Sequence, residues 1–226
     1  MAAAGSMKGF YTALAAVALG GGIFIVGRAM TSKPPLTSET LAPLAVGPRG
    51  VVEGSDSAVV QIMEFSDFEC PYCARFATIQ MPDIRQRLIA TGKVRWTFMH
   101  FPLQGHTKSP VAHLAAACAN AQGKFWPMHD MIYQNQDEWV ESGSPERQLS
   151  DYARRVGLDN TQYGQCMDQR SAWGTVLADK QLGDSLSVNS TPTFYLNGRM
   201  MPNVPTADEL VRIADSLALL RAGPRR

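Results

Sequence analysis

The sequence has almost no net charge, and this excludes several classes of protein. Its 226 residues include 21 lysines and arginines against 20 aspartates and glutamates, so the formal charge is +1 and binding to nucleic acid is not indicated. No phosphate-binding loop, internal repeat or block of like charge occurs. No two of the four histidines have the spacing at which residues of one helix bind a metal ion together. We therefore interpret them as packing or surface residues; they are His100, His106, His113 and His129.

Cysteine is also scarce, but two of the four cysteines are close together in Cys70-Pro71-Tyr72-Cys73. The run 59–65 before this motif is apolar and rich in β-branched residues, which predicts a buried strand. Apolar residues at helical spacing over 74–90 predict a helix after it. Cys70 then lies at the N-terminus of a helix, where unpaired backbone N–H groups and the helix dipole favour a thiolate.

This placement predicts thiol–disulfide exchange. Cys70 is expected to attack a substrate and form a mixed disulfide, and Cys73, one helical turn further on, is expected to resolve it. A zinc site would need two more ligands, and the other cysteines, Cys118 and Cys166, stand singly with no histidine at finger spacing. A purely structural disulfide across so short a loop would gain little from chain entropy.

A second pattern, over 190–199, contains an X-Pro step, a β run and a tight Asn-Gly turn. An X-Pro bond can be cis at modest cost, and this would leave the backbone before Pro192 free to pair with an extended peptide. The alternative interpretation is that the proline merely starts a hairpin.

Several segments, taken in order, add a more specific signal. They are Val60–Cys73, Phe101-Pro102-Leu103, Gln122-Gly123-Lys124-Phe125-Trp126, Gly157-Leu158-Asp159 and Thr191-Pro192-Thr193-Phe194. Together they resemble the DsbA-like branch of the thioredoxin superfamily over roughly residues 44–220. The resemblance implies an α/β protein with a thioredoxin fold and an inserted α-helical domain. It further implies that Cys70 attacks, that Cys73 is buried, and that Thr191-Pro192 is a cis-proline pair in the substrate site.

The resemblance also gives a role to Glu64, which lies six residues before Cys70. The superfamily has a buried acid at this place, which is thought to help move the proton of the resolving cysteine. A carboxyl group in apolar surroundings has a raised pKa, so it could hold or take a proton near neutral pH. A solvated glutamate at the end of a strand is the alternative.

The central pair Pro71-Tyr72 departs from the best-known oxidases of the family, which carry Pro-His. A tyrosine supplies only a neutral hydroxyl, so we expect Cys70 to be a less extreme thiolate and the protein a weaker oxidant. Oxidase, isomerase and reductase remain open at this point. A dimeric isomerase would be expected to carry an N-terminal dimerisation domain, for which 31–49 is too short, and this favours a monomeric oxidase.

The middle of the chain, 109–186, has helical patterns, and strand-like runs at 94–98 and 193–196 flank it. We therefore predict a domain over 50–226 with a helical insertion at about 107–187. Cys118 and Cys166 both lie in that insertion. Some DsbA-like proteins carry an extra bridge, so in an oxidising compartment we expect a structural disulfide worth about 4 kcal/mol. Two free buried cysteines are the alternative.

The N-terminal stretch 9–27 is apolar and uncharged, with Lys8 and Arg28 on either side. Its length approaches that needed to cross a bilayer, so we predict a membrane anchor over 1–30, followed by a linker over 31–49. A cleaved signal peptide is the alternative, because Ala18-Leu19-Gly20 offers small residues at cleavage spacing. Either way the remainder is expected to be periplasmic or otherwise extracytoplasmic, tethered in the first case and secreted in the second.

These features predict an enzyme that introduces disulfides into unfolded or reduced exported proteins. No metal or organic cofactor is expected, because the cysteine pair carries the two electrons, and a membrane redox partner would regenerate it. The alternatives are an isomerase or reductase of the same fold, or a non-catalytic thioredoxin-like module that binds peptides.

Overall fold

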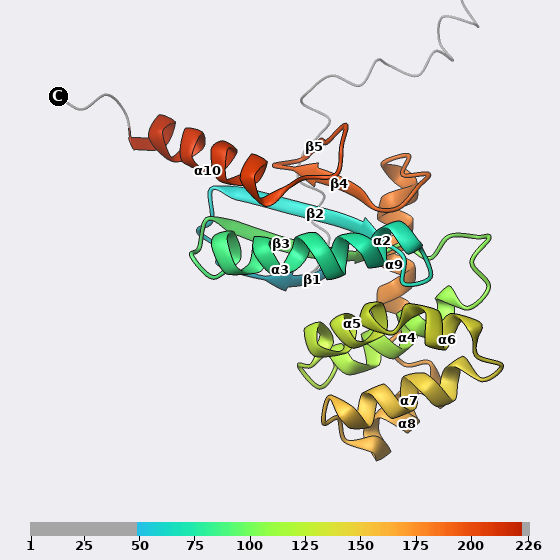
Figure 1. Ribbon diagram of the computed structural model, residues 1–226. Coiled ribbons are helices and arrows are strands. Elements are labelled where there is room, and N and C mark those ends of the chain that lie inside the picture. The colour runs from blue at the N-terminus through green and yellow to red at the C-terminus, as the bar shows by residue number, and fades with distance from the viewer. Residues whose placement is uncertain (1–48, 223–226) are drawn as a thin grey trace, which may run out of the picture. The chain divides into compact units, whose positions relative to one another are not determined.

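The computed structural model of the protein describes residues 49–222 (Figure 1). The predicted anchor or signal segment, 1–30, and nearly all of the predicted linker lie outside these residues. Within 49–222, no helix combines the length and the apolar character needed to cross a bilayer.

Five strands form one mixed sheet, in the order β1-β3-β2-β4-β5. The two central strands, β2 and β3, run parallel, and every other pair of neighbours is antiparallel. Helices cover the central strands on both faces, which suits their long apolar runs. The strands are β1 Val51–Glu53, β2 Val60–Ser66, β3 Val94–His100, β4 Thr193–Leu196 and β5 Arg199–Met200.

One face of the sheet carries Ile62, Glu64 and Ser66 of β2, because alternate residues of a strand point to opposite sides. A helical run that follows β2, together with the C-terminal helix, packs on this face through a shared apolar core. The run includes two π-helical segments, marked η. These elements are α2 Pro71–Arg75, η2 Phe76–Gln80, α3 Met81–Ile84, η3 Arg85–Ile89 and α10 Ala207–Ala222.

The opposite face, which carries Phe65, packs against the helix α9, Trp173–Ser185. Leu182 of this helix joins the apolar cluster around Phe65 and Phe101. Its neighbour Gly183 approaches the sheet so closely that an added Cβ would lie 2.4 Å from the ring of Phe101. The helix therefore packs against the sheet through a position that has room only for glycine.

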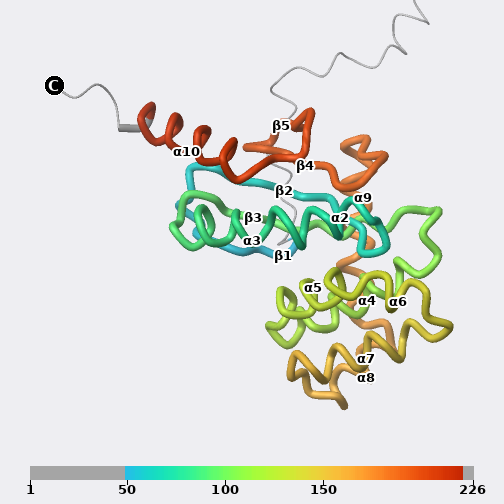
Figure 2. The backbone as a smooth tube through the Cα atoms, in the orientation of Figure 1, coloured from blue at the N-terminus to red at the C-terminus, as the bar shows by residue number. Residues whose placement is uncertain are grey.

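Five further helices lie between β3 and α9 and form a separate cluster beside one end of the sheet (Figures 1 and 2). Together with α9 they occupy the connection between β3 and β4, which confirms the predicted α/β fold with a helical insertion. A disulfide between Cys118 of α4 and Cys166 of α8, with an S–S distance of 1.99 Å, joins the first and last helices of the cluster. The helices are α4 Ser109–Asn120, α5 Phe125–Gln134, α6 Gln136–Glu141, α7 Pro145–Arg155 and α8 Asn160–Gln169.

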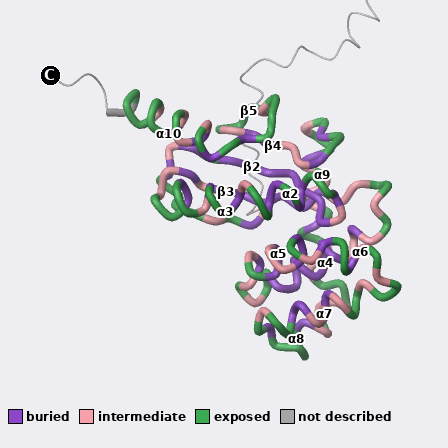
Figure 3. The backbone as a smooth tube through the Cα atoms, in the orientation of Figure 1, coloured by how far each residue is buried: buried purple, intermediate pink, exposed green. Residues whose placement is uncertain are grey.

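The Cys-Pro-Tyr-Cys motif belongs to the core of this helical cluster as much as to the sheet. Phe68, Cys70 and Cys73 pack in one apolar core with residues of α4 and α5 such as Leu114 and Met128. The burial pattern shows this continuity, because buried positions run from the central strands into the inner sides of α4 and α5 (Figure 3). The motif is thus enclosed between the sheet and the inserted helices.

Candidate active site

Cys70 lies at the point where the chain turns from the end of β2 into α2. It is the N-cap residue of α2, with the extended backbone angles φ −76° and ψ 121°, and Pro71 follows in the first turn. Proline is favoured there because its missing N–H would have no partner within the helix. Both cysteines are free thiols, and Cys73 is fully buried while Cys70 keeps 4% of its surface exposed.

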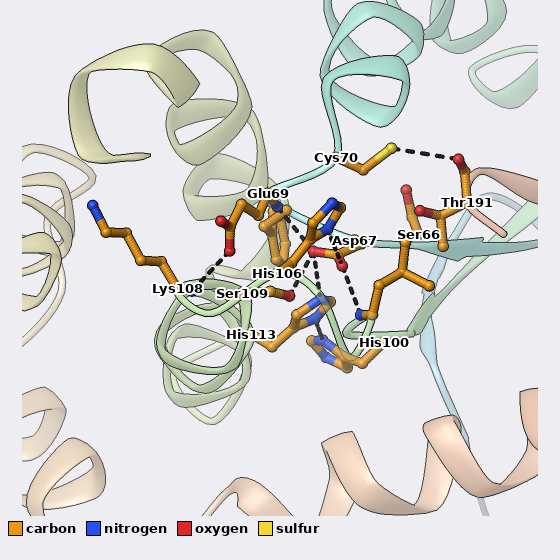
Figure 4. A network of polar contacts seen from close by, with 12 residues as sticks. Ser66, Asp67, Glu69, Cys70, His100, His106, Lys108, Ser109, His113 and Thr191 are labelled. Carbon is orange, nitrogen blue, oxygen red and sulfur yellow. Dashed lines mark hydrogen bonds and ion pairs between the residues drawn. The ribbon is translucent and has the colours of Figure 1, made fainter. Parts of the chain in front are cut away.

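A loop before β4 faces this turn from the opposite side. The Thr191–Pro192 peptide bond is cis, and the thiol of Cys70 donates a hydrogen bond of 3.4 Å to the carbonyl oxygen of Thr191 (Figure 4). The sheet brings the two loops together, because β2 leads into the motif and the antiparallel β4 begins directly after Pro192. The covering loop also explains why so little of Cys70 is exposed.

The two thiols have opposite electrostatic environments. A hydrogen bond from the Cys73 thiol, together with the backbone N–H groups of Tyr72 and Cys73, outweighs burial and lowers the pKa of Cys70 to about 6. Burial and the neighbouring charge of Cys70 raise the pKa of Cys73 well above its usual range. At neutral pH the pair therefore consists of a thiolate at Cys70 and a protonated thiol at Cys73.

Glu64 lies deeper in the same face of the sheet, with 2% of its surface exposed. The indole N–H of Trp96 donates to its Oε2 at 2.8 Å, while its Oε1 is buried with no hydrogen-bond partner among the described residues. Burial raises the pKa of this carboxyl group. A buried carboxyl group with one free oxygen can hold a proton near neutral pH and release it to a neighbouring base.

Asp67, three residues before Cys70, is a site residue that the sequence analysis missed. Its fully buried carboxylate accepts hydrogen bonds from the backbone N–H of Leu103 at 2.7 Å, from His106 at 2.8 Å and from the N–H of Glu69 at 2.9 Å (Figure 4). The hydroxyl of Ser109 donates to Oδ1, the oxygen that also accepts from Glu69, while Leu103 and His106 donate to Oδ2. The carboxylate thus ties the loop before Cys70 to the chain that leads into α4.

Two histidines extend this network into the core. His113 of α4 approaches Asp67 at 3.7 Å, and its Nδ1 is 2.9 Å from Nδ1 of His100 at the end of β3. Burial alone would raise the pKa of Asp67, but its hydrogen bond and charge interaction with His113, and the donors Ser109 and Leu103, hold it well below its usual range. Asp67 is therefore charged at neutral pH despite its burial.

The surface around Cys70 is apolar. Tyr72 and Ile79 of the motif and its helix are 73% and 60% exposed, and Val204, from the chain after β5, is 47% exposed. Together with Phe76 and the polar residues Arg75 and Gln80 they line a hollow of about 240 Å³. A neighbouring hollow, which also includes Val204, runs along Pro192 and β4. A chain bound at this place would contact apolar side chains and the free backbone of the cis-proline loop.

Of the site residues predicted from the sequence, the structure brings Cys70, Cys73, Thr191 and Pro192 together at one end of the sheet. Glu64 lies behind them within the core. Pro71 and Tyr72 are exposed at the start of α2. The remaining pair, Cys118 and Cys166, forms its bridge between α4 and α8, away from the motif.

Comparisons with known proteins agree with this geometry. A family model described as Thioredoxin matches residues 47–216. The structure of oxidised BdbD from Bacillus subtilis resembles this one with a TM-score of 0.66 and 25% sequence identity, over 74% of this chain and 92% of that chain. The chain belongs to the thioredoxin family, in its branch of DsbA-like thiol–disulfide oxidoreductases.

Curated relatives of this DsbA-like chain include proteins named as antiporters and a protein named for disulfide bond formation. The Na(+)/H(+) antiporter NhaA 3 of Salinispora tropica is 36% identical over 152 residues, which are 67% of this chain but 22% of the relative. The chain thus spans about a fifth of the length of that relative. The probable disulfide bond formation protein D of Bacillus anthracis is 29% identical over 169 residues, which are 72% of this chain and 75% of the relative.

Proposed function

We propose that the protein donates disulfides to exported proteins through the pair Cys70–Cys73. A substrate thiolate attacks Cys70 of the oxidised pair, the Cys70–Cys73 bond breaks, and Cys73 leaves and takes up a proton. A second thiolate of the substrate then attacks its own sulfur in the mixed disulfide, and Cys70 leaves as a thiolate. The substrate loses two electrons and the cysteine pair gains them.

The observation that carries the proposal is the contrast between the two thiols. With a pKa of about 6, Cys70 is a good leaving group, and at neutral pH its ionisation stabilises the reduced pair. One unit between the pKa and neutral pH corresponds to about a factor of ten in the equilibrium, or about 30 mV toward a more oxidising potential. A protein with such a pair tends to give its disulfide away.

Glu64, Pro71, Tyr72 and the Thr191-Pro192 loop have supporting roles in this proposal. Glu64 exchanges a proton with Cys73, and the Pro71-Tyr72 pair shapes the start of the helix. The Thr191-Pro192 loop and the apolar surface beside it hold an extended substrate chain by backbone hydrogen bonds and hydrophobic contact. Such contacts select for unfolded chains rather than for a particular sequence.

We place this reaction outside the cytoplasm, with residues 1–30 as membrane anchor or signal peptide, 31–49 as linker and 50–226 as a monomeric catalytic domain. Disulfides persist in oxidising compartments, and the Cys118–Cys166 bridge in the inserted helices supports that location. The antiporter relatives support a location at a membrane, because the segment similar to this chain is part of a protein named as a Na(+)/H(+) antiporter. A membrane redox partner would reoxidise the pair.

Disulfide isomerisation or reduction is the second candidate function, and Tyr72 favours it. Its side chain is 73% exposed and neutral, so the central pair adds no positive charge beside Cys70. The reduction potential separates the candidates. A reduction potential nearer to about −120 mV than to about −270 mV supports a disulfide donor. A reduction potential near about −270 mV supports a reductase or an isomerase.

The experiment that tests the proposal is capture of substrates as mixed disulfides. Cys73→Ala removes the resolving thiol, so a variant whose Cys70 has first been converted to its mixed disulfide with glutathione should exchange the glutathione for thiols of reduced unfolded proteins. These proteins should accumulate as covalent adducts on Cys70 that dithiothreitol releases. The matched control, Cys70→Ala, retains the buried thiol and should capture nothing. Equal capture by both variants, or none by Cys73→Ala, would contradict the proposed mechanism and leave a peptide-binding module.

A further inference from the structure

A buried glutamine of the inserted helices contacts the loop that carries Cys70. Gln136 is the first residue of α6, and only 8% of its surface is exposed. Its side-chain nitrogen Nε2 lies 2.6 Å from the carbonyl oxygen of Phe68 and 3.0 Å from that of Cys70. Both neighbours can only accept, so the amide group donates one hydrogen to each. One side chain thus connects the inserted helices with the backbone of Cys70.

This contact completes the backbone hydrogen bonds of Cys70. Its N–H donates to the carbonyl oxygen of Asp67 at 3.1 Å. Its own carbonyl oxygen accepts from the N–H of Ala74 at 3.1 Å, which is the first bond of α2, and from Gln136. A carbonyl oxygen has two lone pairs, so both are used. With its N–H and its carbonyl group both held, Cys70 has little freedom to rotate, and its Cα–Cβ bond keeps one direction.

The helix α6 is itself held at both ends of the contact region. Trp139 is fully buried in the apolar core that α6 shares with the motif. Near the end of the helix, Nζ of Lys108 donates to the carbonyl oxygens of Val140 and, at 2.9 Å, Ser142. The backbone N–H of the same lysine donates at 2.8 Å to the carboxylate of Glu69, the residue directly before the motif. The helix is therefore anchored well enough to hold the loop of Cys70 in place.

The position of Cys70 matters because neighbouring groups stabilise its sulfur. Cys70 is the N-cap residue of α2, and the backbone N–H groups of Tyr72 and Cys73 help to lower its pKa. On the other side, the sulfur is 3.4 Å from the carbonyl oxygen of Thr191. A hydrogen bond weakens steeply as it departs from linearity, so a small rotation of the Cys70 backbone would weaken the stabilisation of the thiolate.

We propose that Gln136 is a positioning residue for the thiol–disulfide exchange at Cys70. It holds the carbonyl groups of Phe68 and Cys70, and the sulfur of Cys70 therefore stays directed at the first turn of α2. This inference rests on the proposed function and deepens it. The inserted helices would then influence the reactivity of Cys70 in addition to covering it.

The variant that tests this role is Gln136→Met. Methionine has a similar length and no hydrogen to donate, and both side chains are neutral, so a changed pKa of Cys70 cannot come from a changed charge. The matched control is Gln122→Met. Gln122 also connects two segments of backbone, because it donates to the carbonyl oxygen of Asp159 at 3.3 Å and accepts from its N–H at 2.8 Å. Neither of these bonds involves the loop of Cys70.

The measurement is the rate at which iodoacetamide alkylates Cys70 in the reduced full-length protein, followed over a range of pH by mass analysis of the Cys70 peptide. Loss of the hydrogen bonds from Gln136 should raise the pKa of Cys70 from about 6 to about 7. The rate should then fall about fivefold at about pH 6 and stay the same at about pH 9, where the sulfur is ionised in both proteins. The equilibrium with glutathione at neutral pH should move about fivefold toward the disulfide, because the reduced pair loses stabilisation.

A Gln136→Met protein with the pH profile and glutathione equilibrium of the wild type would overturn the role of Gln136 while the proposed function stands. An equal change in Gln122→Met, or a fall in rate of the same size at every pH, would also contradict it. If Gln136→Met does not fold, Gln136→Asn, whose amide lies one methylene group further from the two carbonyls, decides by the same criteria. A wild-type Cys70 with the pKa of an ordinary cysteine, about 8.5, would instead refute the proposed function itself.

Discussion

Replacement of Asp67 by asparagine should strongly destabilise the protein. The carboxylate is fully buried and accepts from Leu103, His106 and Glu69 at 2.7–2.9 Å and from the hydroxyl of Ser109. Asparagine has nearly the same shape but no charge, and it turns an NH₂ group toward donors that need an acceptor. The change therefore leaves at least one buried donor unsatisfied.

The magnitude follows from these contacts. A hydrogen bond to a charged group contributes about 1.5–3 kcal/mol, and loss of one partner from a buried ionic network costs about 3–5 kcal/mol. We expect the free energy of unfolding to fall by about 3 kcal/mol in Asp67→Asn. For a domain of this size, the melting temperature should then fall by roughly 6–12 °C.

Urea unfolding at several pH values measures this effect. Because the folded pKa of Asp67 is lowered, its contribution is present in full above the unfolded pKa of about 4 and is lost as the pH falls through the folded pKa. The difference between wild type and Asp67→Asn should be constant from about pH 8 to about pH 5 and should shrink in more acidic solution.

The matched control is Asp56→Asn. Asp56 forms an ion pair of 2.9 Å with Arg95, but its side chain is 93% exposed. A surface substitution of this kind should change stability by no more than about 0.5 kcal/mol. An Asp67→Asn variant within about 1 kcal/mol of wild type, or a difference that grows in acid, would refute the reasoning about the buried network.

Two other substitutions test the packing of the fold. Gly183→Ala should lower the free energy of unfolding by about 1–3 kcal/mol, because the new methyl group would overlap the ring of Phe101, and thermal unfolding measures the loss. An unchanged melting temperature would mean that α9 can move away from the sheet at no cost. Replacement of both Cys118 and Cys166 by serine should lower stability by about 4 kcal/mol through loss of the loop constraint, as urea unfolding of the oxidised protein would show. Equal midpoints with and without the bridge would contradict that account.

Local patterns were enough to predict most helices and strands. The helices α4 to α9 all lie within the region 109–186 that is predicted to be helical, and the strand predicted over 193–196 has those bounds in the structure. The strand Val51–Glu53 was not predicted, since it has three residues and is defined by its pairing with β3.

The residues of the candidate site also differ in whether the local sequence is enough to predict them. The spacing of Cys70 and Cys73 is a local property, so the motif could be located from the sequence. Asp67 could not, because an aspartate in a loop is ordinarily exposed, and its burial depends on donors that lie 36 residues away at Leu103 and 42 residues away at Ser109. An acidic residue between Phe65 and Phe68, directly before the motif, is the signal that could have drawn attention to it.

The core that the motif shares with the inserted helices limits how far this architecture can be simplified. Phe68, Cys70 and Cys73 pack against α4 and α5, so an excision of α4 to α8 that joined β3 directly to α9 would uncover an apolar wall. Water would then reach the inner thiol, and the difference between the two sulfurs would shrink. A shortened version of this protein would therefore need newly designed residues that bury this apolar surface, so that Cys73 stays shielded from water.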